Sequence, residues 1–268
     1  MFQITLLFLY IIAGSSLAIS RLPRYSRYVK ALVTIALLTG IAGLLWHALL
    51  LRNLILLPDG IYLSLGNTAS FIGLLLGLTA LIITAEQTLR GLAAGLLLLA
   101  ASTGVLTGWT AAPPSDTAIT WQIEAHILIS LFAYGLLTVG AIVAVYALLQ
   151  DRRLRAGKLS TVNRLFAPLE TNEKLLYGIA AGGFLALLLA VFSGFLFVED
   201  LFAQHLVHKT VLSLLALLLF GILLCGRQFG GWRGRRAVAL YLWGFVVLGL
   251  AYFGSRYVLE EVLGRSWT

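Results

Sequence analysis

Apolar segments of about twenty residues recur along the whole chain, for example LYGIAAGGFLALLLAVFSGFLFV at 176–198. A helix of about 20 residues crosses the ~30 Å hydrocarbon core of a bilayer. These segments are apolar on all sides, which is typical of a membrane span, whereas a helix at the surface of a soluble protein is amphipathic. Of the 268 residues, 60% are hydrophobic and only 11% are charged, which is too few to cover a soluble core. The sequence therefore predicts a polytopic membrane protein.

The predicted fold is all-α, a bundle of eight transmembrane helices in a single transmembrane domain over 1–268. Backbone groups in lipid must pair within the protein, and these runs are too long to be strands of a barrel. The spans are expected at 2–20, 29–50, 61–84, 91–108, 121–150, 174–198, 208–226 and 237–262. Thr171, which opens the stretch TNEK, is expected to cap the sixth span.

The distribution of basic residues predicts that the N-terminus and the C-terminus both lie outside. With this orientation the inner connections hold fifteen of the nineteen Lys and Arg residues and four of the eleven acids. These connections are 21–30, 85–90, 151–174 and 227–236. Basic residues directly follow the first segment, so we interpret it as an uncleaved anchor and not as a secretory signal.

The net charge of +8 therefore indicates orientation in a lipid bilayer, and we expect no nucleic-acid partner. No basic stripe with interleaved aromatic residues, the usual mark of a nucleic-acid surface, is found in the sequence. The inner basic loops also allow contact with anionic lipid or with a cytosolic partner.

The four histidines, His47, His126, His205 and His208, fall at the predicted outer ends of the second, fifth and seventh spans. Ionisable residues contributed by different helices suit a site between helices. A haem iron takes axial ligands from opposite faces, and the macrocycle needs an apolar slot. At most one of His205 and His208 should ligate a given iron, because they lie three residues apart on one helix. Zinc is an alternative, for which these two residues would supply two ligands.

Other side chains at the same predicted depth are candidates for contact with haem. Arg52, Lys209 and Arg256 are the outer cations available to the propionates, and Trp121 offers a flat surface. Snorkelling of the cations and interfacial anchoring of the tryptophan are the alternative interpretations. The only cysteine is Cys225, which excludes a CxxCH attachment site, so the predicted cofactor is non-covalent haem b.

Four stretches resemble a known family, including SGFLFVEDLFAQHLVHKTVLSLLALLLFGILL at 193–224 and GWRGRRAVALYLWGFVVLGLAYFGSRYVLE at 231–260. EAHILISLFAYGLLTVGAIVAVYALLQDRRLR at 124–155 resembles the helix of cytochrome c assembly (CcsA/CcmC/HemX-type) membrane proteins that begins with a haem-ligand histidine at the outer face. WHALLLRNLILLPDGIYLSLGNTASFIGLL at 46–75 resembles the preceding histidine-containing span, loop and helix. The resemblance covers most of the chain, and it carries a haem-ligand role to His126 first and to His47 second.

The resemblance implies a bacterial inner-membrane protein that binds or handles haem at its outer face and assists cytochrome c assembly. Its implied partners are other membrane proteins, including cytochrome c assembly components. Haem-exporting members carry WGxxWxWD in an outer loop, where this chain has EDLFAQHLVHKT at 199–210 and no tryptophan. Arg256 stands where the resemblance leads us to expect a histidine.

Two other functions fit the sequence less fully. A haem-free scaffold or regulator of another membrane protein, such as an ion transporter, would retain the fold alone. A small-solute transporter would need polar residues at the bilayer midplane, and the spans offer little beyond Asn67, Thr68 and Ser70. We expect no covalent catalysis, since no nucleophile–base pair, phosphate loop or metal-hydrolase spacing is found.

The predicted topology can be tested with reporter fusions in the 151–174 connection. Because six basic residues lie there, a cytoplasmic reporter should be active and a periplasmic reporter silent. Activity of the periplasmic reporter at this position would overturn the placement of the histidines at the outer face.

Overall fold

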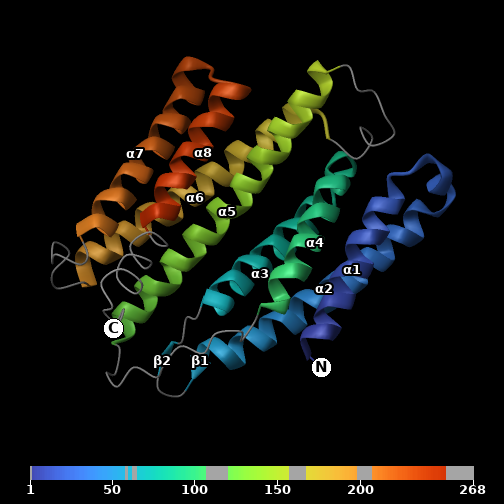
Figure 1. Ribbon diagram of the computed structural model, residues 1–268, viewed down its shortest axis with the longest axis horizontal. Coiled ribbons are helices and arrows are strands. Elements are labelled where there is room, and N and C mark those ends of the chain that lie inside the picture. The colour runs from blue at the N-terminus through green and yellow to red at the C-terminus, as the bar shows by residue number, and fades with distance from the viewer. Residues whose placement is uncertain are drawn as a thin grey trace. The chain divides into compact units, whose positions relative to one another are not determined.

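The structure is a computed structural model that describes residues 2–57, 60–61, 65–106, 120–156, 167–197 and 207–251. Its α-helices are α1 (Phe2–Ser20), α2 (Val29–Ile55), α3 (Leu65–Ile83), α4 (Arg90–Val105), α5 (Trp121–Arg155), α6 (Leu169–Phe197), α7 (Val207–Gly230) and α8 (Arg235–Gly249) (Figure 1). Two short 3-10 helices, η1 (Pro23–Tyr28) and η2 (Gln87–Leu89), directly precede α2 and α4. A two-stranded antiparallel hairpin joins β1 (Leu56–Leu57) to β2 (Gly60–Ile61).

Seven helical segments in the described part of the chain are long and apolar enough to cross a membrane. The predictions of an all-α fold and of a polytopic membrane protein are therefore confirmed. The eighth helix, α8, has 15 described residues, and its expected continuation to residue 262 lies outside the described part. The outside location of both termini stays a prediction.

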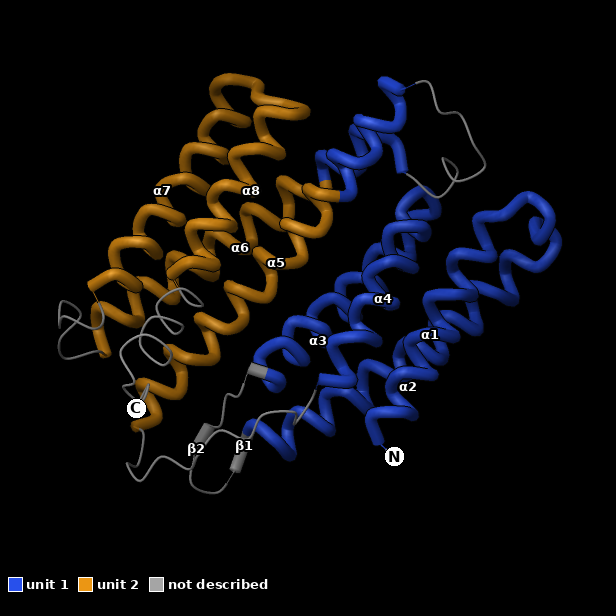
Figure 2. Tube along the Cα trace, in the orientation of Figure 1, with its two compact units in different colours: residues 1–114, 146–174 blue, residues 115–145, 175–268 orange. Residues whose placement is uncertain are grey.

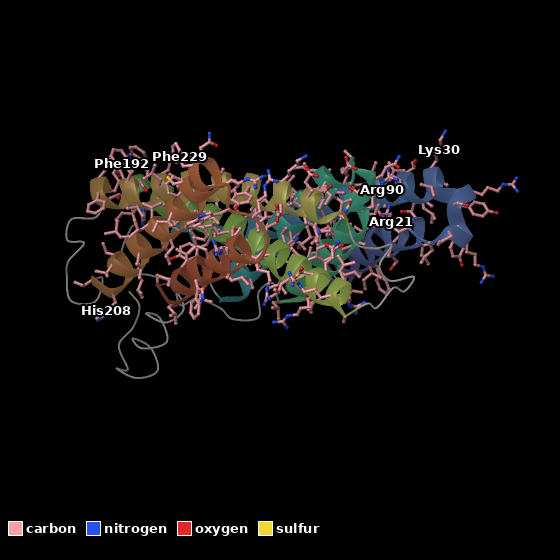
Figure 3. The ribbon with its side chains drawn as sticks, turned by 90° about the horizontal axis from the view of Figure 1, so that it is seen from above. Arg21, Lys30, Arg90, Phe192, His208 and Phe229 are labelled. Carbon is pink, nitrogen blue, oxygen red and sulfur yellow. The ribbon has the colours of Figure 1, made fainter. Side chains whose placement is uncertain are left out.

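Large apolar side chains cover the outward faces of the helices, as expected for surfaces in contact with lipid. Leu38 and Ile82 are each 66% exposed, and Phe192 of α6 is 59% exposed (Figure 3). Exposure of this kind along several helices is unfavourable in water and favourable in hydrocarbon.

The sixth helix begins at Leu169, so the prediction of a cap at Thr171 is wrong. Pro168 immediately precedes the helix, and the amide of Asn172 donates to the Pro168 carbonyl at 3.1 Å. Because this i to i−4 bond is already helical, Thr171 lies inside the first turn of α6 and is not its N-cap. Proline is well suited to this place, because its fixed φ is compatible with a helix start.

The first compact unit comprises residues 1–114 and 146–174 (Figure 2). Within it α1 packs against α2 and α4, and α3 packs against α4. The buried residues Leu6, Tyr10, Ala13 and Leu17 of α1 follow the helical repeat and form one face. Gly43 of α2 allows close approach, because a Cβ there would lie 3.1 Å from the ring of Tyr10.

The second compact unit comprises residues 115–145 and 175–268. Its core contains the fully buried Tyr241 of α8, whose hydroxyl donates to the Leu137 carbonyl at 3.0 Å. The Tyr241 ring packs edge-on against Phe220 of α7, with the ring centroids 5.1 Å apart. Both α5 and α6 contribute residues to both units. The single transmembrane domain stays a prediction.

We predict that Gly140→Ala lowers the apparent Tm in detergent. A Cβ at Gly140 would collide with the Tyr241 hydroxyl, and overpacking of this kind costs about 1–3 kcal/mol. Gly95→Ala in α4 is the matched control, because no atom lies within 4 Å of the added methyl group. There alanine should leave stability unchanged or raise it through helix propensity. Equal Tm changes in the two variants would contradict the packing described for α8.

Candidate functional site

His126 lies in the second turn of α5, in the second unit, and its ring is tied to α6. Its Nδ1 atom is 2.9 Å from the hydroxyl oxygen of Ser193. The Ser193 hydroxyl in turn donates to the Ala190 carbonyl at 2.9 Å. A carbonyl can only accept, so the single hydroxyl hydrogen is used there, and Ser193 accepts from an Nδ1–H group. Neutral His126 therefore carries its proton on Nδ1 and a lone pair on Nε2.

Within the described ranges, no residue forms a hydrogen bond with the Nε2 atom of His126. Gly194 lies beside the ring, and a Cβ at that position would be 3.1 Å from the His126 Cε1 atom. Imidazoles that bind metals usually donate the other ring N–H to an oxygen, which fixes the tautomer and the orientation. Ser193 and Gly194 therefore fix the His126 ring in the way that is usual for an imidazole that binds a metal.

A positive charge lies near this imidazole. Lys209 lies in the first turn of α7, within electrostatic range of the His126 ring. The start of α5, the end of α6 and the start of α7 thus contribute to one end of the second unit. This end of the second unit therefore combines an imidazole nitrogen, from His126, with a cation, Lys209, that could bind an anionic group of a ligand.

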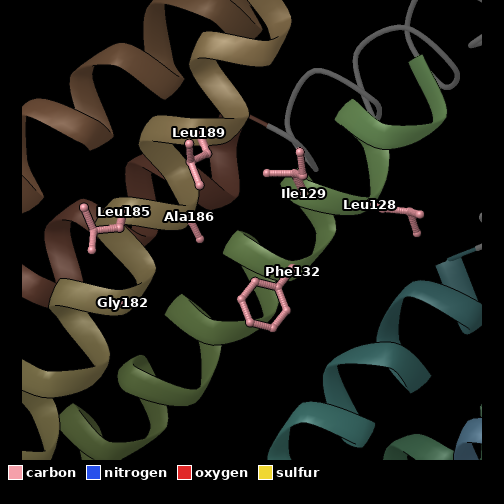
Figure 4. A pocket seen from close by; sticks show the side chains of 7 residues that line it. All are labelled: Leu128, Ile129, Phe132, Gly182, Leu185, Ala186 and Leu189. Atoms are coloured by element: carbon pink, nitrogen blue, oxygen red, sulfur yellow. The ribbon is translucent and has the colours of Figure 1, made fainter. Parts of the chain in front are cut away.

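An apolar groove of about 460 Å³ runs between α5 and α6 from the same end (Figure 4). Ile129 is three residues after His126, and Leu189 is four residues before Ser193, so the groove starts one helical turn from the hydrogen-bonded pair. Its lining residues are Leu128, Ile129, Phe132, Gly182, Leu185, Ala186 and Leu189. The groove is open on one side, since Leu128, Phe132, Leu185 and Leu189 in its lining are each more than a third exposed.

His47 belongs to the first unit and is held differently. It is fully buried, with Nδ1 3.3 Å from the Tyr10 hydroxyl and Nε2 2.8 Å from the Ser70 hydroxyl. These bonds connect α2 to α1 and to α3. Both ring nitrogens are engaged, so ligation of a metal by His47 would require one of the two hydrogen bonds to break.

The remaining predicted residues are more exposed or lie outside the described residues. His208 is exposed at the start of α7 (Figure 3). Arg52 is exposed in the last turn of α2. Trp121 is 69% exposed, with its ring centroid 6.3 Å from that of Phe197. His205 and Arg256 fall outside the described part of the chain. No group of three or more His, Cys, Asp or Glu residues that could hold a metal ion is found among the residues described.

Three residues of these sites were not predicted from the sequence: Ser193, Gly194 and Tyr10. Ser193 and Gly194 interrupt an apolar run one turn before the end of α6, at the depth where the antiparallel α5 carries His126. A small polar residue in a neighbouring span, at the same depth as the histidine, is the sequence signal that could have identified Ser193 as the hydrogen-bond partner of His126. Tyr10 has no comparable feature, because tyrosines are common in apolar spans.

We predict that His47→Ala lowers the apparent Tm much more than His208→Ala does. The first change removes a fully buried ring and leaves the Tyr10 and Ser70 hydroxyls without that partner, which costs about 2–4 kcal/mol. The second change affects an exposed side chain and should be nearly neutral. Thermal unfolding in the same detergent measures both variants, and equal values would contradict a structural role for His47.

The chain matches a family model described as "Cytochrome C assembly protein" over residues 35–263. It is 34% identical over 236 residues to "Inner membrane protein YpjD" of Escherichia coli strain K12, covering 85% of this chain and 87% of that protein. An "Uncharacterized 28.8 kDa protein in nifR3-like 5'region" of Azospirillum brasilense is 32% identical over 144 residues, or 53% of each chain. No solved structure matches the chain significantly. The extent of the family match and of the Escherichia coli relative shows that the chain belongs to the cytochrome c assembly protein family.

Proposed function

We propose that this chain binds or handles non-covalent haem b in cytochrome c assembly, at the end of the second unit where His126 lies. The observation that carries the proposal is His126, whose Nδ1 is held by Ser193 beside an apolar groove and whose Nε2 has no hydrogen-bond partner among the described residues. Membership of the cytochrome c assembly family supports it. The predicted localisation, the bacterial inner membrane with several spans, agrees with the seven candidate spans and with the name of the Escherichia coli relative.

The described residues fit the chemical needs of haem. Haem supplies an iron that takes imidazole nitrogens as axial ligands, and the protein tunes it through ligand identity and second-shell hydrogen bonds. His126 offers the nitrogen, and the Ser193 oxygen fixes its tautomer. The groove between α5 and α6 offers apolar surface for a macrocycle, and Lys209 offers a cation for a propionate.

A second axial ligand would come from another helix. His208 is exposed and needs no rearrangement of a buried network, whereas His47 would lose a hydrogen bond to Tyr10 or Ser70. His205, Arg256, Arg52 and Trp121, all predicted from the sequence to lie at the outer face, stay candidates for contact with haem. The proposed partners are other membrane proteins, including cytochrome c assembly components.

The proposal predicts that protein purified from haem-replete cells shows a low-spin Soret band that His126→Ala strongly weakens. Ser193→Ala should keep the band but lower haem affinity by about tenfold, since loss of a partner behind a ligating histidine typically costs 10–100-fold. Ser102→Ala is the matched control, because its hydroxyl likewise bonds a carbonyl three residues earlier, in α4. Absorption spectra during haem titration measure all three variants.

Two results would contradict the proposal. Wild-type protein that stays colourless after expression with excess haem would remove the haem function and favour the haem-free scaffold or regulator. A full Soret band in His126→Ala, with loss in His205→Ala and His208→Ala, would retain haem but reject His126 as its ligand.

A further inference from the structure

The turn between α7 and α8 is held in a fixed shape by its own contacts. The amide of Trp232 donates to the Gly226 carbonyl at 3.0 Å. The Trp232 carbonyl accepts from the Tyr177 hydroxyl of α6 at 2.7 Å and from Arg227 at 3.4 Å. The Arg227 guanidinium also lies 4.8 Å from the centre of the Tyr177 ring. The turn is therefore anchored to the neighbouring helix and does not depend on a partner for its conformation.

Glycines make this arrangement possible. A Cβ on Gly226 would collide with the Trp232 ring, so the indole lies directly on the end of α7. Gly231 and Gly234 have φ of +60° and +62°, a conformation that other residues rarely adopt. The sequence RQFGGWRGRR at 227–236 thus specifies one backbone path.

That path presents a group of positive charges. Arg233, Arg235 and Arg236 are all exposed, and the described residues form no ion pair with them. No Asp or Glu occurs anywhere in 207–251. Arg235 and Arg236 open α8, where the helix dipole is already positive and acidic residues are normally preferred. No carboxylate within 207–251 therefore offsets these charges.

The turn also lies at a membrane surface. α7 is one of the candidate spans and ends at Gly230. Phe229, in its last turn, is 87% exposed (Figure 3). An exposed aromatic ring at the end of a span lies at the depth of the lipid headgroups and upper acyl chains. A loop that only sets orientation needs positive charge, but it needs neither a fixed backbone nor this exposed ring.

We propose that the α7–α8 turn is a binding site for the headgroup of an anionic phospholipid in the adjoining leaflet. Arg233, Arg235 and Arg236 would contact the phosphate and its anionic substituent, while Phe229 enters the upper acyl region. Arginine suits phosphate because its planar guanidinium donates two parallel hydrogen bonds. Four or more basic residues next to a span are typical of sites for anionic lipid, and Arg227 is the fourth.

Lipid titration of the full chain in detergent, read by native mass spectrometry, tests the site. Wild-type protein should retain phosphatidylglycerol in preference to phosphatidylcholine. Changing Arg233, Arg235 and Arg236 together to Gln should weaken phosphatidylglycerol binding by about tenfold or more, as expected for the loss of three charges near a surface. The same three changes to Lys keep the charge and should restore most of the binding.

The matched control removes three exposed charges elsewhere, with Arg24, Arg27 and Lys30 changed to Gln. It should bind phosphatidylglycerol as the wild type does, and so should His126→Ala, because the proposed haem site is separate. Equal loss in this control and in the α7–α8 variant would overturn the site in favour of general charge attraction. Two further results would overturn the proposed site. One is wild-type protein that shows no preference for phosphatidylglycerol, and the other is displacement of the lipid by excess inorganic phosphate.

Discussion

The bilayer requires every polar group inside it to find a partner within the protein, and this requirement shapes both histidine environments. Buried His47 and half-buried His126 each have a hydroxyl partner on a neighbouring helix. His47 satisfies both ring nitrogens and so ties three helices together. For His126, the described residues supply a partner to Nδ1 alone, the Ser193 hydroxyl, which donates its own hydrogen to Ala190. The difference between a structural and a ligand-like histidine therefore follows from hydrogen-bond supply and not from residue type.

Most of the fold could be predicted from the lengths of the apolar runs. Seven of the expected spans correspond to helices with the predicted centres, because span length is set by bilayer thickness. Helix ends were less predictable: α6 starts at Leu169 because Pro168 precedes it, and α5 extends to Arg155. A hairpin of two residues per strand has too little sequence pattern to be predicted.

The site was only partly predictable for a related reason. Sequence placed His126 and Lys209 at one membrane face, because rare polar residues in apolar helices are conspicuous. The roles of Ser193 and Gly194 depend on which faces of α5 and α6 meet, which an apolar run does not encode. The two ends of α7 carry separate features: the helix has 24 residues and is about 36 Å long, with Lys209 in its first turn and the arginine-rich turn after its last residue. A ligand at one end therefore leaves the other end accessible.

The central claim is that His126 presents an unprotonated Nε2 to haem while Ser193 holds its Nδ1–H. Nitrogen-15 NMR of histidine-labelled protein, before and after addition of the diamagnetic analogue zinc protoporphyrin IX, tests it most directly. The account predicts that His126 is protonated on Nδ1 in both states and that its Nε2 resonance alone moves on binding, with His47 unchanged. A proton on Nε2 of His126 in the free protein, or a shift confined to other histidines, would contradict the account.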